Sequence, residues 1–203
     1  MEEFVLYAYP FRSRAERIIW TLREFGFPYR VIRIDPFKGE TRSAEFGALN
    51  PQRKVPVLVH EGKALTESLA IMEYLNHVSS PLKLIPSDRD DFYRYSRALH
   101  FGATELESYL WIADQATRLK NYYPWPEGTL ETAPKPVKRA VRFASEWLSE
   151  TTYMAGDEFT LADIFYYGLL TWARKYDVTL EEQTNKYLAV LEQRAAFPDE
   201  LRI

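Results

Sequence analysis

The sequence predicts a two-domain protein in which an α/β domain is followed by an all-helical domain. Short β-prone apolar runs alternate with stretches of helical periodicity over residues 4–76, whereas the pattern is helical from residue 87 onward. Pro81 and Pro86 lie between these two regions and mark a linker. The predicted boundaries are 1–79 for the first domain, 80–87 for the linker and 88–203 for the helical domain.

Four short strands and three helices are predicted in the first domain. The strands are expected at 4–9, 29–34, 55–60 and 64–66, and the helices at 14–25, 43–48 and 68–77. The strand–helix–strand start predicts parallel pairing, because parallel strands need a crossover connection of this kind. Glu61-Gly62 joins the last two strands as a hairpin and predicts an antiparallel edge. The predicted sheet is therefore small, mixed and covered by helices.

Four helices are predicted in the second domain. Ser87 to Asp90 forms a capping box that opens a long helix ending near Leu119. Prolines between residues 124 and 136 are expected to break the segment that follows. The remaining helices are expected at 137–149, 161–175 and 180–194.

Composition excludes several classes of protein. The 26 basic and 29 acidic residues nearly balance, which gives no general attraction to nucleic acid or to an anionic membrane. The absence of cysteine removes disulfides, cysteine nucleophiles and thiol redox pairs, and His60, His77 and His100 are not in metal-ligand spacing. The longest apolar run, Ile164–Ala173, is shorter than the roughly 20 residues that span a bilayer, and the acidic start is unlike a secretory signal. We therefore expect a cytoplasmic globular protein without a metal.

Pro56 lies inside an apparent strand, where it removes a backbone donor. Two interpretations follow. The segment is an edge strand or bulge, or the Val55-Pro56 bond is cis and turns the Val55 N–H and C=O toward a pocket. In the second case, an extended peptide can pair with Val55 as a short extra strand.

Glu67 and Ser68 stand where the next helix is expected to begin. Free N–H groups at a helix start suit a ligand carboxylate, and Glu67 can meet a ligand amine. The alternative is that the pair only caps the helix.

The two segments together resemble a known signature. Asn50–Leu58 and Glu67–Leu75 are similar to the glutathione-binding motifs of cytosolic glutathione transferases, roughly N-P-x-G-K-V-P-x-L and E-S-x-A-I-x-x-Y-L, with Arg53 where glycine is usual. Gly156–Ile164 resembles the family's buried capping-box and staple motif, which concerns folding. Ser13–Trp20 resembles the start of a bacterial and fungal serine-type subgroup. The resemblance covers essentially the whole chain.

The resemblance implies a thioredoxin-like first domain of βαβαββα order and a cytosolic homodimer. Glutathione is then a co-substrate rather than a cofactor, and its thiolate attacks a small hydrophobic electrophile, as in detoxification. Carried over from the motif, Val55 pairs with the cysteinyl backbone and Pro56 is the cis-proline. Glu67 and Ser68 hold the γ-glutamyl end, and Lys54 faces the glycyl end.

The catalytic group must stabilise a thiolate. A free thiol has a pKa near ~8.5, and lowering it by about two units requires about 2.7 kcal/mol. A helix dipole supplies about 0.3–1 kcal/mol and one hydrogen bond to the charged sulfur about 1.5–3 kcal/mol, so a hydroxyl and a dipole together suffice. Ser13 is the first candidate, although Ser13-x-x-Glu16 is also a capping box, and the Arg12 guanidinium is the second.

The electrophile is expected to bind where the two domains meet. The expected lining residues are Phe11, His100, Tyr109 and Trp111. The aromatic segment 122–126 either covers this pocket or only joins two helices. Alternative functions are a glutathione-dependent isomerase or peroxidase on the same site, or a transferase-like interaction module that has lost catalysis.

Overall fold

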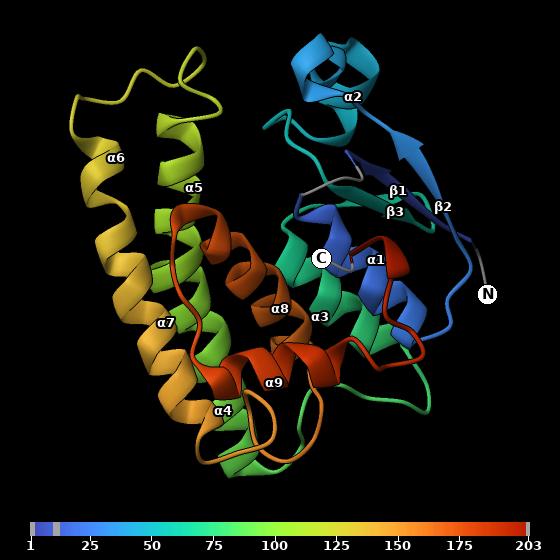
Figure 1. Ribbon diagram of the computed structural model, residues 1–203. Coiled ribbons are helices and arrows are strands. Elements are labelled where there is room, and N and C mark those ends of the chain that lie inside the picture. The colour runs from blue at the N-terminus through green and yellow to red at the C-terminus, as the bar shows by residue number, and fades with distance from the viewer. Residues whose placement is uncertain (1–2, 10–12, 202–203) are drawn as a thin grey trace. The chain divides into compact units, whose positions relative to one another are not determined.

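The computed structural model describes residues 3–9 and 13–201, and the chain folds into two compact units (Figure 1). The first comprises Met1–Lys83 with Arg194–Ile203, and the second Leu84–Gln193. By its contacts, the C-terminal segment from Arg194 groups with the first unit. Phe197 packs edge-on against Trp20 with ring centroids 4.9 Å apart. The Arg194 guanidinium donates to both carboxylate oxygens of Glu24, at 2.7 and 2.9 Å.

The first unit contains a four-stranded mixed sheet in the order β2-β1-β3-β4. Its strands are β1 (Phe4–Ala8), β2 (Tyr29–Arg33), β3 (Val57–His60) and β4 (Lys63–Leu65). β1 and β2 are parallel, while β3 is antiparallel to both β1 and β4. The βαβαββα order and the antiparallel edge hairpin are as predicted.

Helices α1 and α3 pack together and bury one face of this sheet. The helices of the unit are α1 (Ala15–Glu24), α2 (Ala44–Leu49) and α3 (Ser68–Val78). Alternate residues of β1, Phe4, Leu6 and Ala8, are fully buried and join Ile18 of α1 and Ile71 of α3 in one core. The alternation explains why β1 forms a half-buried strand whose register is fixed.

The second unit is all-helical, as predicted. Its elements are α4 (Arg89–Phe101), a π-helical segment (Gly102–Glu107), α5 (Ser108–Ala116), α6 (Thr129–Thr132), α7 (Pro134–Leu148), α8 (Leu161–Ala173), a 3-10 turn (Arg174–Tyr176) and α9 (Glu182–Leu191). The long helix predicted from residue 88 is continuous through the π segment. Pro134 and Pro136 do not break a helix but lie in the first turn of one. Backbone N–H groups in a first turn have no acceptor within the helix, so proline loses no hydrogen bond there.

Gly102, in the π segment, lies closely against α8. A Cβ at this position would stand 2.7 Å from Cε1 of Phe165, nearer than a side chain can approach without a shift. Glycine is therefore required here for the close approach of the two helices, not for its backbone freedom.

Asp163 organises the start of α8. Thr160 caps the helix, and the Asp163 side chain accepts from the Thr160 N–H at 2.7 Å, which completes the expected capping box. The same carboxylate accepts from the Met154 N–H and the Tyr187 hydroxyl, both at 2.8 Å. Burial raises the pKa of Asp163, with these hydrogen bonds acting in the opposite direction.

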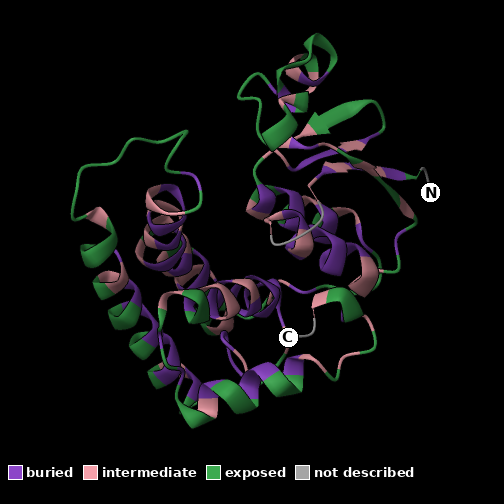
Figure 2. Cartoon of the chain, turned by 45° about the horizontal axis from the view of Figure 1, so that its top comes forward, coloured by how far each residue is buried: buried purple, intermediate pink, exposed green. Residues whose placement is uncertain are grey.

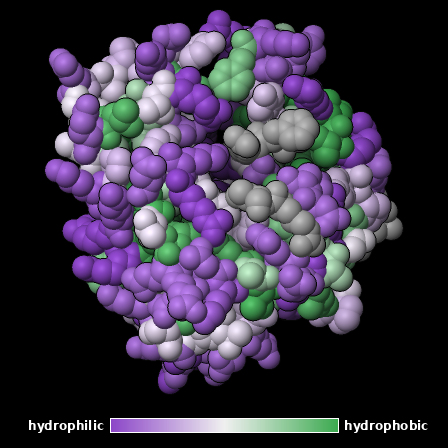
Figure 3. All heavy atoms as spheres, in the orientation of Figure 1, coloured by the Kyte–Doolittle hydropathy of each residue, from purple (hydrophilic) through white to green (hydrophobic). Residues whose placement is uncertain are grey.

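Within the described residues, no helix has the length and apolarity needed to cross a membrane. Figure 2 shows buried residues on the inward helix faces of each unit and an exposed loop between α5 and α6. On the face drawn in Figure 3, hydrophilic side chains predominate and hydrophobic ones form separate patches.

Candidate functional site

The start of α3 has an unusual backbone conformation. Glu67, directly before the helix, is exposed and adopts φ 64° and ψ 107°, a region that costs a residue with a side chain of the order of 1–3 kcal/mol. Its carbonyl accepts from the Ile71 N–H at 2.9 Å and so begins the helix. Neither residue of the Glu67-Ser68 pair makes a side-chain capping bond within the described chain, so plain capping does not explain them.

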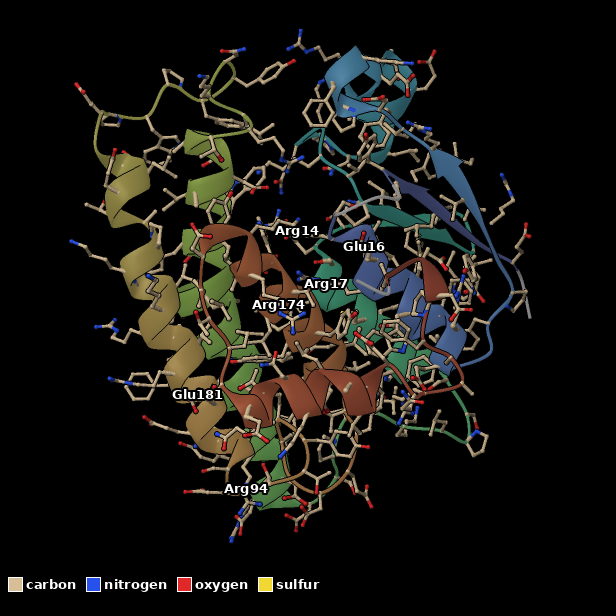
Figure 4. The ribbon with its side chains drawn as sticks, in the orientation of Figure 1. Arg14, Glu16, Arg17, Arg94, Arg174 and Glu181 are labelled. Atoms are coloured by element: carbon tan, nitrogen blue, oxygen red, sulfur yellow. The ribbon has the colours of Figure 1, made fainter. Side chains whose placement is uncertain are left out.

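Ser68, the first residue of α3, is only 7% exposed and contacts a buried arginine. Nη1 of Arg17 on α1 donates to the Ser68 Oγ at 3.4 Å. Arg17 is also only 7% exposed, and Figure 4 shows it on α1. Because guanidinium is a cation at any ordinary pH, the start of α3 has a buried positive charge beside its own free N–H groups.

Arg17 is a candidate functional residue that the sequence motifs did not indicate. The available signal was an arginine between Ala15 and Ile18, both on the apolar stripe of a predicted helix. Such a charged side chain needs a partner inside the protein, since an arginine is rarely buried alone. The sequence did not indicate that this partner is Ser68, which lies 51 positions away.

The Val55-Pro56 bond is cis, as one of the two interpretations expected. β3 begins at Val57, where pairing with Tyr7 of β1 ends, and Val55 lies outside the ladder. Pro56 is buried and Val55 half-buried. In the described part of the chain, nothing hydrogen-bonds to the Val55 N–H or C=O, which leaves both groups open to an extended ligand.

Buried Asn50 holds the turn before this bond. Its side-chain oxygen accepts from the Gln52 N–H at 3.0 Å, and its Nδ2 donates to the Lys54 carbonyl at 2.8 Å. The side chains of Gln52 and Lys54 are exposed. Lys54 therefore has a fixed backbone and a side chain that can reach an anionic ligand group.

Arg53, where the family motif has glycine, adopts φ 55°. Its guanidinium donates to the carbonyls of Thr41 at 3.3 Å and Ser43 at 3.0 Å. The side chain passes so close to Gly47 that a Cβ there would lie 2.9 Å from Nη2. Arg53 thus has a left-handed backbone conformation, and its side chain ties this turn to the segment before α2.

The Ser13 hydroxyl is engaged locally. Its Oγ donates to the Tyr9 carbonyl and accepts from the Ala15 N–H at 3.2 Å. A capping box would have Oγ accept from the Glu16 N–H, but that group donates to the Ser13 carbonyl at 3.1 Å. Arg12, the second catalytic candidate, and Phe11 lie outside the described residues.

The other candidates for the electrophile pocket belong to the second unit. His100 is exposed and its Nδ1 bonds to the Ser96 carbonyl at 2.7 Å. Trp111 packs edge-on against Tyr123 with centroids 6.0 Å apart, and Tyr109 is half-buried. Their role in binding an electrophile stays a prediction. No cluster of His, Asp or Glu suited to a metal occurs among the described residues.

Comparison with known proteins identifies the family. Residues 2–77 match the glutathione S-transferase N-terminal domain, and residues 119–196 match the C-terminal domain. The glutathione S-transferase GstA of Escherichia coli O157:H7 is 29% identical over 179 residues, 87% of this chain and 85% of that protein. Glutathione S-transferase 1 of Dianthus caryophyllus is 31% identical over 169 residues, 81% of this chain and 74% of the relative.

Two further matches cover nearly the whole chain. The maleylacetoacetate isomerase of Rattus norvegicus is 28% identical over 198 residues, 93% of this chain and 88% of the relative. A crystal structure of a glutathione S-transferase domain-containing protein from Marinobacter aquaeolei VT8 superposes with a TM-score of 0.86 at 23% identity, over 96% of this chain and 100% of that one. The first domain is thus thioredoxin-like, the second is all-helical, and the chain belongs to the glutathione S-transferase family.

Proposed function

We propose that the protein is a glutathione transferase that joins the glutathione sulfur to a small hydrophobic electrophile. The observation that carries the proposal is the Val55 backbone, whose N–H and C=O have no partner among the described residues although they directly precede a paired strand. Open pairing groups at this position suit a short peptide added in the extended conformation.

The remaining binding groups fit the ends of the tripeptide. Ser68, which accepts from Arg17, and the start of α3 provide hydrogen-bond donors for the γ-glutamyl carboxylate. Exposed Glu67 can accept from the γ-glutamyl ammonium, and exposed Lys54 can meet the glycyl carboxylate. Pro56 supports the Val55 backbone in the required orientation.

Activation of the sulfur is assigned to Ser13, with Arg12 as the second candidate. To donate to a thiolate, the Ser13 hydroxyl must rotate away from the Tyr9 carbonyl while its oxygen still accepts from Ala15. The thiolate sulfur then forms a C–S bond with the electrophilic carbon. In a substitution the bond to the leaving group breaks and its electron pair departs with that group; in an addition the π bond breaks and its electron pair takes up a proton from solvent. Phe11, His100, Tyr109 and Trp111 are proposed to line the electrophile pocket, in a cytoplasmic homodimer with a detoxifying role.

A second candidate is glutathione-dependent isomerisation, favoured by the 28% identity to the rat maleylacetoacetate isomerase over 198 residues. The same bound thiolate can add to a conjugated double bond, allow rotation and leave again. A product panel with an aryl halide, a maleyl compound and an organic hydroperoxide distinguishes transferase, isomerase and peroxidase. Turnover of none of them, with glutathione still bound, would favour a non-catalytic interaction module.

The deciding experiment is calorimetric titration of glutathione into the wild type, Ser68→Ala and Ser149→Ala. Ser149 is an exposed serine in the second unit whose hydroxyl donates to its own helix, so its variant is a matched control. We expect Ser68→Ala to weaken binding about tenfold or more and Ser149→Ala to leave it unchanged. Absence of binding to the wild type would overturn the proposed function.

Catalysis is tested separately on Ser13→Ala, Arg12→Ala and the double variant. The readouts are the ultraviolet thiolate signal of bound glutathione and the turnover of an aryl halide. A double variant with wild-type thiolate signal and turnover would remove both residues from the mechanism, whereas loss in one single variant would identify the residue that stabilises the sulfur.

A further inference from the structure

The hydrogen bond between Arg17 and Ser68 has a fixed direction. A guanidinium has five N–H donors and no acceptor, so the Ser68 Oγ must be the acceptor in the 3.4 Å contact. The serine then has its own hydrogen left to donate. Arg17 therefore determines which way the Ser68 hydroxyl points.

No described residue accepts that hydrogen, so its acceptor must be solvent or a ligand. The residue is only 7% exposed, so water has little access to its hydroxyl. A buried donor left without a partner carries a desolvation cost, which a bound acceptor removes. Ser68 is thus prepared to donate to a group that arrives at the start of α3.

The surroundings favour a negatively charged acceptor. Arg17 is buried to the same extent as Ser68, so solvent screens its effect on the Ser68 hydroxyl less than it would at the surface. An O–H group that accepts from a cation is also a stronger donor, because hydrogen bonds polarise one another. Both effects increase the affinity of the Ser68 hydroxyl for a carboxylate.

We propose that Arg17 is a positioning residue for glutathione, and that it acts on the γ-glutamyl carboxylate through the Ser68 hydroxyl. This inference rests on the proposed function. It assigns Arg17 a specificity role, because Arg17 strengthens binding of a peptide with a free α-carboxylate and not of one without it.

The test is a double-mutant cycle on glutathione binding with Arg17→Met, Ser68→Ala and the double variant. We expect Arg17→Met to weaken binding about tenfold in the wild-type background and less than about twofold in the Ser68→Ala background. Equal weakening in both backgrounds would overturn the inference, because Arg17 would then act without Ser68.

A second ligand separates a positioning role from a merely structural one. The analogue in which γ-aminobutyrate replaces the γ-glutamyl residue lacks the α-carboxylate and is expected to bind all four proteins alike. A loss of analogue affinity in Arg17→Met equal to the loss for glutathione would also overturn the inference. Because the glutathione titration of the wild type is measured first, failure of the proposed function is recognised independently.

Two further variants protect the test against unfolding. Arg17→Lys keeps a buried cation and a donor, and is expected to bind glutathione with an affinity between those of the wild type and Arg17→Met. If Arg17→Met fails to fold, the double-mutant cycle is run with Arg17→Lys instead. Arg23→Met removes another cation from α1, one that contacts Tyr29 and Glu200 instead of Ser68. It is expected to leave the affinity unchanged, and a tenfold loss in this control would contradict a role specific to Arg17.

Discussion

The Arg53 guanidinium donates to the Ser43 carbonyl at 3.0 Å, so the turn before the cis bond is tied to the start of α2. The contact joins two positions ten residues apart. It explains how an arginine with φ 55° is tolerated where the family motif has glycine. The hydrogen bonds of the side chain offset the cost of the left-handed backbone.

Arg53→Ala and Arg53→Gly separate these two contributions. Alanine keeps the backbone cost of roughly 1 kcal/mol and loses the hydrogen bonds to Thr41 and Ser43, so we expect a loss of about 1–2 kcal/mol in the free energy of unfolding. Glycine loses the same bonds but relieves the backbone, and should be the more stable variant of the two. Urea denaturation measures both, and equal stabilities would contradict the explanation.

Asp163→Ala should be among the most destabilising changes in the chain. It leaves the buried N–H groups of Thr160 and Met154 and the Tyr187 hydroxyl without their acceptor, which costs about 3 kcal/mol or more. Chemical denaturation gives the loss. Asp157→Ala is the matched control, since within the described residues this exposed carboxylate accepts only from Thr152, at 3.3–3.4 Å. A similar loss there would contradict the assignment.

Tyr176 is expected to make stability depend on pH in the alkaline range. Burial, and then its hydrogen bond to Asp114, raises the pKa of Tyr176 to about 12. In the unfolded chain the phenol ionises near pH ~10, so above that pH the unfolded state binds fewer protons than the folded state. The contribution of Tyr176 to the free energy of unfolding is therefore fully present below about pH 10 and is lost as the pH rises toward 12.

The measurement is the difference in unfolding free energy between the wild type and Tyr176→Phe, taken from pH 8 to 11 by urea denaturation. The wild type should be the more stable protein at pH 8, and its advantage should shrink above about pH 10. Comparison with Tyr176→Phe cancels the contributions of the other buried tyrosines. An advantage that stays constant or grows with pH would show that Tyr176 does not titrate as described.

Phe197→Ala should release the C-terminal segment from the first unit. The ring is 4% exposed and packs against Trp20, so its removal should cost about 3 kcal/mol. Trp20 fluorescence should shift to longer wavelength, and residues 194–201 should become sensitive to proteolysis. Val190→Ala, an exposed apolar residue on α9, is the control; resistance of Phe197→Ala to proteases would argue against anchoring by this contact.

The order of elements could be predicted because hydrophobic periodicity is local. Alternation over β1 and the apolar stripe of α1 indicated the sheet and its helices within one or two residues of their ends. The hairpin of β3 and β4 could be predicted from Glu61-Gly62, because a turn signal is also local in sequence. The contact between Phe197 and Trp20 could not be predicted, since one aromatic residue has no periodicity that identifies its partner.

For the candidate site, the sequence indicated residues that lie in contiguous motifs, but not contacts between residues that are distant in sequence. Val55, Pro56, Glu67 and Ser68 lie in contiguous motifs, and the cis bond was one of two stated alternatives. Arg17 was missed because its partner comes from another helix. The partners of Arg53 were likewise hidden, since Thr41 and Ser43 contribute only carbonyl groups, which every residue has.

The π segment at Gly102–Glu107 has a consequence for side-chain direction along the helix that contains it. Because a π turn uses about one residue more than an α turn, every later side chain is set back by about 100° around the axis relative to an unbroken α-helix. A helical wheel started at Arg89 therefore assigns Tyr109 and Trp111 to the wrong faces of α5. The directions in which Tyr109 and Trp111 project, and with them the proposed electrophile pocket, therefore depend on the backbone winding of these six residues.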